Sequence, residues 1–267
     1  MKPELHINID HIATVRQARR TLEPSPLEAV RLLESTKATG VTMHLREDRR
    51  HVNDEDIRAV DVYLRAGSRL GLTFEMGATE EIRTICLSTK AKLATLVPEK
   101  REELTTEGGL DVLAQRVYLT EFIKPIKANG TDISMFVDPV IDQIEASREI
   151  GAQFVELHTG TYANLFIKYH ADKAAIGATY TSGLKLSLSD LVDPVQQEIL
   201  RLKTAVEYAQ SIGLKANLGH GLTIPNLSPL LEQITGVQEL HIGHSIVANS
   251  LYYGLREVVA EFVRVIN

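Results

Sequence analysis

The sequence LHINID (5–10) is the first of eight short apolar runs, and the spacing of the other seven decides the fold. They are VTMHL (41–45), LTFEM (72–76), LATLV (93–97), ISMFVD (133–138), FVELH (154–158), KANLG (215–219) and ELHIG (239–243). Their length and content of β-branched and aromatic residues are typical of buried strands. Helical stretches separate the runs, and this alternation predicts parallel strands in one buried sheet. Eight such units in 267 residues favour an α/β fold of the (β/α)8 TIM-barrel type.

The predicted helices carry apolar residues at helical spacing, as expected for faces that pack on a barrel. They are LEAVRLLESTKA (27–38), DEDIRAVDVYLR (54–65), TEEIRTICLSTK (79–90), LAQRVYLTEFIKPIKANG (113–130), DQIEASREIGA (142–152), QQEILRLKTAVEYAQSIG (196–213), NLSPLLEQITG (226–236) and IVANSLYYGLREVVAEFVRVI (246–266). An open doubly wound sheet is the alternative, but it usually has a glycine fingerprint after the first strand. NIDHIATVR (8–16) has none, so we prefer the barrel.

No linker rich in Pro, Gly or Ser divides the chain, which predicts one barrel domain over residues 1–267. Two connections are longer than ordinary turns. The first (97–112) is polar and ends in two glycines, which favours a loop able to close over a ligand. The second is an insert at about 160–194. It is too apolar for a linker, and we expect extra helical structure near 162–175.

Composition excludes several classes of function. A net charge of −6 argues against non-specific nucleic-acid binding, because no basic face would neutralise phosphates. No apolar run approaches the roughly 20 residues of a membrane span, and no signal peptide is recognisable, so we expect a cytoplasmic protein with no membrane partner. The single cysteine, Cys86, lies in a predicted helix and is expected to be a small buried hydrophobe.

Residues able to transfer protons stand at the ends of the predicted strands. In a barrel all these ends meet at one face, the usual place of the active site. Glu75 lies in an apolar run, where desolvation would raise the pKa of its carboxyl towards the range of a general base. His44 and His220 could supply the opposing acid and base. The other polar residues at strand ends are Asn8, Asp10, Glu156 and His158.

Two segments could hold phosphate groups. NLGHGLT (217–223) and HIGHS (241–245) place the backbone N–H groups of Gly219, Gly221, Gly243 and His244 before helices, where barrels often bind phosphate. HLREDRRH (44–51) brings Arg46 and His51 close to His44, whereas its Arg49 and Arg50 are expected to be solvated. A third positive group near the first strand consists of Arg16, Arg19 and Arg20.

Metal catalysis is not predicted. The chain has nine histidines, but it contains neither an HxH nor an HExxH motif. We therefore expect no metal cofactor.

Seven blocks resemble those of the pyridoxine 5′-phosphate synthase family, in the same order from residue 5 to about 256. They are NIDHIATVRQAR, GVTMHLREDRRH, FEMGATEE, LVPEKREELTTEGGLD, FVELHTGTYA, NLGHGLT and ELHIGH. The resemblance implies condensation of 1-deoxy-D-xylulose 5-phosphate with 3-amino-2-oxopropyl phosphate. The products are pyridoxine 5′-phosphate, inorganic phosphate and water, and no cofactor takes part. It also implies a homo-oligomer, typically an octamer.

The same resemblance assigns roles to residues. His44 and Glu75 match proton acceptors, His220 a proton donor, and Glu156 a carboxylate that stabilises the transition state. The aminoketone phosphate is matched to Asn8, Arg19, Gly221, Gly243 and His244, and the deoxyxylulose phosphate to Asp10, His11, Arg46, His51 and Thr105. The segment from Leu165 to about Pro194 is longer than the family pattern. A phosphosugar isomerase or aldolase of the same fold, or a non-catalytic barrel that binds a phosphorylated metabolite, stays open as an alternative.

Overall fold

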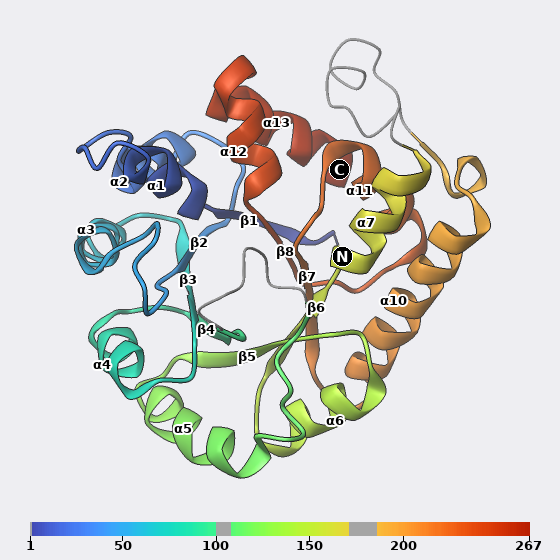
Figure 1. Ribbon diagram of the computed structural model, residues 1–267, viewed down its shortest axis with the longest axis horizontal. Helices are drawn as coiled ribbons and strands as arrows, with labels where there is room; N and C mark the ends of the chain where they lie inside the picture. Colours follow the sequence, from blue (N-terminus) through green and yellow to red (C-terminus); the bar gives the residue numbers. More distant parts are fainter. Residues whose placement is uncertain (1, 100–107, 171–185) are drawn as a thin grey trace.

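The barrel fold is confirmed. The computed structural model describes residues 2–99, 108–170 and 186–267, and eight parallel strands close into a barrel in chain order (Figure 1). The strands are β1 (Glu4–Asn8), β2 (Gly40–His44), β3 (Gly71–Met76), β4 (Leu93–Leu96), β5 (Asp132–Val137), β6 (Phe154–His158), β7 (Lys215–Gly219) and β8 (Glu239–Ile242). Each of the eight predicted runs contains most of one strand.

Helices surround the barrel (Figure 1). Those that return the chain from one strand to the next are α2 (Pro26–Leu33), α3 (Asp54–Arg65), α4 (Glu80–Ser88), α5 (Arg116–Ala128), α6 (Ile141–Glu149), α10 (Asp193–Ser211) and α11 (Ile224–Gln233). The last helix, α13 (Leu255–Ile266), follows β8 and packs between α11 and α2. Three more begin directly after strands, namely α1 (Asp10–Gln17), α7 (Gly160–Tyr169) and α12 (His244–Tyr253). A short 3-10 helix, η1, spans Leu188–Asp190. Because α1, α7 and α12 start where strands end, their N-termini lie at the face of the barrel formed by the C-terminal ends of the strands. We call this face the mouth.

The two faces of the strands differ in polarity. Outward residues such as Ile7, Val41 and Leu157 pack on the helices in the main hydrophobic core. Side chains alternate along a strand, so the residues between them point into the barrel. Many of these are polar although buried, namely His6, Thr42, Thr73, Thr95, Ser134, Glu156, Asn217 and His241. Burying polar groups is costly unless they are paired, and some of these residues pair between strands, as His6 does with Thr73 and Thr42 with His241. Among the described residues, Thr95, Ser134 and Glu156 have buried side-chain oxygens without a hydrogen-bond partner.

The structure differs from the sequence prediction at two points. Asp10 is not the end of a strand, because β1 stops at Asn8 and Asp10 is the first residue of α1. The stretch from 246 to 266 is not one helix, because Gly254 adopts φ 85° and separates α12 from α13. The helix expected near 162–175 is present as α7, which ends at Tyr169 with His170 as its C-cap; residues 171–175 lie outside the described residues.

Candidate active site

The first group at the barrel mouth joins β1, β2 and β3. The Asn8 side-chain amide donates to Asp10 Oδ2 at 2.9 Å and faces Glu75 Oε2 at 3.4 Å. Asp10 Oδ1 accepts from the backbone N–H of His44 at 2.8 Å. His44 and Glu75 are direct neighbours in the register of β2 and β3. The structure therefore brings together four of the residues that the sequence singled out.

Glu75 and Glu156 are two buried carboxyls that face each other across the barrel. One carboxylate oxygen of each residue and one ring nitrogen of His241 all lie within 4.8 Å of one another. Burial raises the pKa of Glu75 well above its usual value, and the charges of Glu156 and Asp10 raise it further. Burial also works to raise the pKa of Glu156, but His241 and His220 outweigh it and the pKa is lowered. Of the two carboxyls, Glu75 is thus the one that takes up a proton more readily.

Glu99 was missed by sequence reasoning, although it holds His44. Its Oε1 lies 2.8 Å from His44 Nε2, and its carboxylate also accepts from the backbone N–H groups of Gly77 and Glu47, each at 3.0 Å. An ionised carboxylate only accepts hydrogen bonds, so Nε2 carries the hydrogen. In the neutral ring Nδ1 then has the lone pair. Glu99 stands in the connection after β4, and no strand-end pattern points to it.

His220 lies directly after β7 on a left-handed backbone, with φ 74°. Its ring stacks near Phe136 with 4.3 Å between ring centroids, and its Nδ1 lies 3.8 Å from Glu156 Oε1. Thr159 fixes the turn, because its hydroxyl donates to the carbonyls of Gly219 and His220. Non-glycine residues rarely adopt positive φ, and such residues cluster at functional sites.

Glycines permit close approach at the same mouth. A Cβ on Gly219 would stand 2.0 Å from Glu156 Oε1, and one on Gly243 would stand 2.9 Å from Asn8 Cβ. Gly221 has φ 80°. Gly243 precedes α12, whose first residue, His244, packs edge-on against the His11 ring at 5.2 Å. The N-terminus of α12 therefore faces the mouth, where backbone N–H groups favour an anion.

The other residues predicted to bind substrate differ from one another in burial and position. Arg46 is buried beside Asp48, at 3.4 Å from its carboxylate. The His51 ring lies 5.9 Å from that of His44, and burial, with the charges of His44, His11 and Arg46, lowers its pKa to about 3. Arg19 lies past the end of α1 and is exposed, so the described chain does not bring it to the other site residues. Thr105 lies outside the described residues, as does the rest of the segment 100–107 of the predicted loop.

Histidines and carboxylates gather closely enough in three places to be tested as metal sites. These are His6–Glu239–His241, Asp10–His44–His51 and Glu75–Glu156–His241. In the second group Asp10 accepts two hydrogen bonds, His44 Nε2 meets Glu99, and His51 Nδ1 accepts from the Val52 N–H. In the first, His6 Nδ1 meets Thr73 and His241 Nε2 meets Glu239. The named atoms of these two groups are engaged in protein contacts, so we assign no metal ligands to them.

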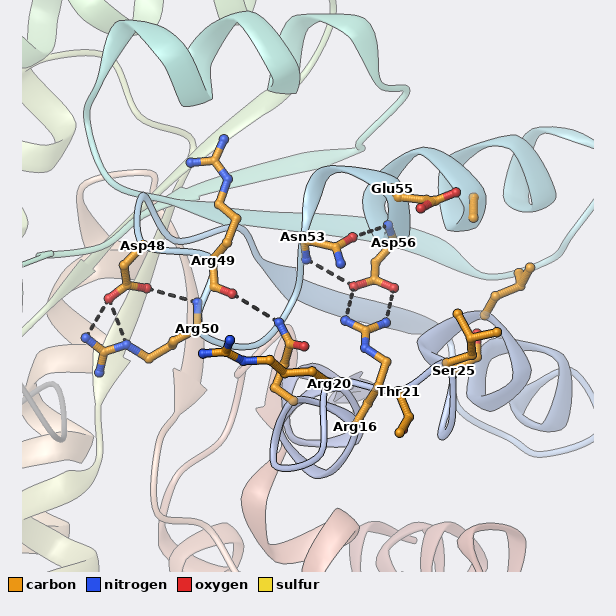
Figure 2. Close-up of a pocket in the computed structure, with 14 residues that line it drawn as sticks. Arg16, Arg20, Thr21, Ser25, Asp48, Arg49, Arg50, Asn53, Glu55 and Asp56 are labelled. Carbon is orange, nitrogen blue, oxygen red and sulfur yellow. Dashed lines mark hydrogen bonds and ion pairs between the residues drawn. The ribbon is translucent and has the colours of Figure 1, made fainter.

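A pocket of about 670 Å³ lies on the flank of the barrel, between α1 and α3 (Figure 2). Arginines line it, but most are matched by carboxylates: Arg49 pairs with Asp54 and Glu81, and Arg50 with Asp48. Arg50 is exposed, as expected, whereas Arg49 is only partly exposed and is held by its two ion pairs. Arg16 donates to both oxygens of Asp56, at 2.5 and 2.7 Å, and is therefore not a free anion-binding group.

The Arg16–Asp56 pair predicts a stability effect. Asp56→Ala should lower the free energy of unfolding by about 3–5 kcal/mol, because it leaves a buried guanidinium without its partner. The two side chains are each only 9% exposed. The matched control is Glu55→Ala, whose partner Arg58 is 76% exposed and whose own side chain is 81% exposed; it should cost no more than about 1 kcal/mol. Urea denaturation measures both, and equal small losses would contradict a structural role for the buried pair.

Comparison with known proteins agrees with this geometry. The family model "Pyridoxal phosphate biosynthesis protein PdxJ" matches residues 5–267. The chain is 42% identical over 263 residues to pyridoxine 5′-phosphate synthase of Aquifex aeolicus (strain VF5), with 98% of each chain covered. It is 46% identical over 257 residues to the synthase of Synechococcus sp. (strain WH7803), covering 96% of this chain and 92% of that one. The chain belongs to the PdxJ family. The resemblance seen in the sequence blocks is thereby confirmed.

Solved structures share the barrel at low identity. Phosphoribosyl anthranilate isomerase from Thermus thermophilus aligns with a TM-score of 0.55 at 14% identity, covering 98% of each chain. An HpcH/HpaI aldolase/citrate lyase family protein from Burkholderia cenocepacia J2315 gives 0.53 at 11%, covering 96% of this chain and 95% of that one. These similarities agree with the barrel fold, but at such low identity they give no information about the reaction of this PdxJ-family chain. Among the described residues, no helix combines the length and apolarity needed to cross a bilayer.

Proposed function

We propose that this chain is a pyridoxine 5′-phosphate synthase, which condenses 1-deoxy-D-xylulose 5-phosphate with 3-amino-2-oxopropyl phosphate. The products are pyridoxine 5′-phosphate, inorganic phosphate and water. One observation carries the proposal: two facing carboxyls with opposite pKa shifts share the barrel mouth with His44 and His220. The full-length match to the synthases supports the substrate class.

The reaction needs several proton transfers at one place. An amine attacks a ketone to give an imine, water and phosphate leave, and a carbanion closes the ring. Glu75 is the proposed base, because burial and the charges of Glu156 and Asp10 raise the pKa of its carboxyl and make it a stronger proton acceptor. His44 is the second proposed acceptor, through the Nδ1 lone pair that Glu99 leaves on the ring. His220 is the proposed donor.

Glu156 is the proposed stabiliser of positive charge on the imine. Its side chain is fully buried, and neither carboxylate oxygen has a hydrogen-bond partner among the described residues. Its lowered pKa keeps it ionised. A buried carboxylate without hydrogen bonds is costly, so a cation that forms in front of it is strongly favoured.

Two phosphate positions complete the proposed site. Asn8, Gly243 and His244 lie at the N-terminus of α12, and Gly221 lies against the first turn of α7. These four residues are assigned to the aminoketone phosphate, together with Arg19. Asp10, His11, Arg46 and His51 stand on the side of β1 and β2 and are assigned to the deoxyxylulose phosphate. Thr105 is assigned there too, by the sequence pattern alone.

The proposal extends to the whole chain. Residues 1–267 form one domain, in a homo-octamer located in the cytoplasm. Exposed apolar side chains at the end of α12 support self-association, because Leu251 is 70% and Tyr252 is 82% exposed. Cys86 is buried, which fits a reducing compartment where no disulfide is needed.

Turnover of both substrates together tests the function. The purified protein is incubated with both phosphorylated substrates, and with each alone, and mass spectrometry follows the products. We expect pyridoxine 5′-phosphate and one equivalent of inorganic phosphate only when both are present. Cleavage or isomerisation of the sugar phosphate alone would support the aldolase or isomerase alternative, and binding without turnover would support the non-catalytic barrel.

Chelation tests the expectation that the reaction needs no metal. Activity should survive exhaustive treatment with a chelator, because proton transfer by Glu75, His44 and His220 needs no Lewis acid. The control is the same enzyme dialysed without chelator. Loss of activity that one added metal restores would overturn this expectation and would point to the Glu75–Glu156–His241 group.

A further inference from the structure

Beneath the proposed active site, a buried histidine connects two carboxylates. His241, on β8, is 4% exposed. Its Nε2 lies 3.0 Å from Glu239 Oε2, below it in the barrel, and its Nδ1 lies 3.9 Å from Glu156 Oε2. The ring nitrogen Nδ1 is also 2.9 Å from Thr42 Oγ1. A ring that meets a carboxylate on each side is suited to carry a proton on both nitrogens.

We propose that His241 is a positioning residue, which holds Glu156 ionised and aligned from beneath through the buried series Glu239, His241 and Glu156. The proposal rests on the proposed function, because Glu156 is the group that would stabilise the cationic intermediate. His241 touches neither substrate nor reacting atoms in this account. Its charge acts on the reaction only through Glu156.

Charges around His241 agree with a protonated ring. Burial works to lower the pKa of His241, but Glu156 and Glu239 outweigh it and the pKa is raised. Glu75 also approaches within 4.8 Å, from β3. From β1, His6 packs at 5.1 Å between ring centroids; burial, with the charge of His241, lowers its pKa to about 4. β2 and β7 present the neutral Thr42 and Asn217.

Shifts of the acid limb in the pH profile separate this role from a merely structural one. Activity requires ionised carboxylates at the mouth, so kcat/KM falls on the acid side as the Glu75–Glu156 pair takes up a proton. His241→Asn removes a positive charge beside the pair, and the acid limb should move to higher pH by about one unit or more. Glu239→Gln removes a carboxylate that keeps the His241 ring charged, so it should also move the limb to higher pH. This shift should be smaller than in His241→Asn, because the lost charge of Glu239 itself raises the pKa of Glu156.

His6→Asn is the matched control, because His6 is equally buried at the same level but neutral near pH 6. Its acid limb should coincide with that of the wild type. An unmoved limb in folded His241→Asn would overturn the proposal. If that variant does not fold, Glu239→Gln decides alone: a limb that stays or moves to lower pH contradicts the series.

A second measurement does not depend on turnover. Neutron diffraction from crystals of the wild type in D2O at pH 6.5 shows which ring nitrogens carry deuterium. We expect deuterium on both Nδ1 and Nε2 of His241, and on one nitrogen of His6. A singly deuterated His241 would overturn the inference even if the wild type makes pyridoxine 5′-phosphate. Absence of product with a doubly deuterated His241 would instead count against the proposed function alone.

Discussion

Replacing Glu75 by glutamine is expected to lower kcat by at least about 100-fold while the protein stays folded. Glutamine keeps the shape of the side chain and the Asn8 neighbour at 3.4 Å, but it cannot accept a proton. KM for both substrates should change little, because Glu75 is assigned to proton transfer and not to phosphate binding. Steady-state kinetics with circular dichroism as a control for folding measures the effect. Turnover near that of the wild type would remove Glu75 from the mechanism.

Glu75→Gln is expected to lower activity but to raise the stability of the folded protein at neutral and higher pH. A carboxyl whose pKa is raised in the folded protein contributes stability below its ordinary value of 4.5, and this contribution is lost as pH rises through the raised value. Glu75→Gln stays neutral at every pH. It should therefore melt at a higher temperature than the wild type at neutral and higher pH, and the difference should vanish at low pH. A melting temperature that is lower at every pH would contradict the raised pKa of Glu75.

Replacing His44 by alanine is expected to lower kcat by at least about 100-fold as well. The imidazole is held by Glu99 at 2.8 Å, and its loss removes the second proton acceptor and leaves the Glu99 carboxylate without its partner. Glu99→Gln should show a smaller loss, because the ring remains but the carboxylate no longer fixes which nitrogen carries the hydrogen. Steady-state kinetics of both variants gives the order of the two effects.

A control for His44 is available inside the same barrel. His6 is also buried, but it contacts Thr73 and Glu239 below the mouth. His6→Asn should keep kcat near the wild-type value, since His6 meets no proposed substrate group. Equal losses in His44→Ala and His6→Asn would mean that both act through the stability of the barrel, and the assignment of His44 would fall.

The sequence predicted the barrel because each strand is marked by its own apolar run and each predicted helix by apolar residues at helical spacing. FVELH and KANLG match β6 and β7 residue for residue. The site followed from the same logic, since parallel strands must end at one face and Glu75, Glu156 and His44 stand near those ends. The boundary at Asp10 was missed because an acidic residue in a helical first turn also fits the end of a strand pattern.

Contacts between distant segments could not be predicted in this way. Arg16 looked like an anion-binding group, yet Asp56, 40 positions away, neutralises it. Glu99 stands in a polar connection with no strand-end signal, and only the folded chain brings it to His44. The alternation along β8 places His241 on the inward face, but it does not show that its two carboxylate partners come from β6 and β8. Pairing partners depend on register and closure of the barrel, which the sequence of one segment does not contain.

The most direct test of the central claim is a crystal structure of the wild type with pyridoxine 5′-phosphate bound. The claim is that the chemistry takes place at the mouth, where Glu75, His44 and His220 meet. We expect the ring of the product to lie between these three residues, with its phosphate against the N-terminus of α12. Product bound instead in the arginine-lined pocket between α1 and α3, with the mouth unoccupied, would contradict it.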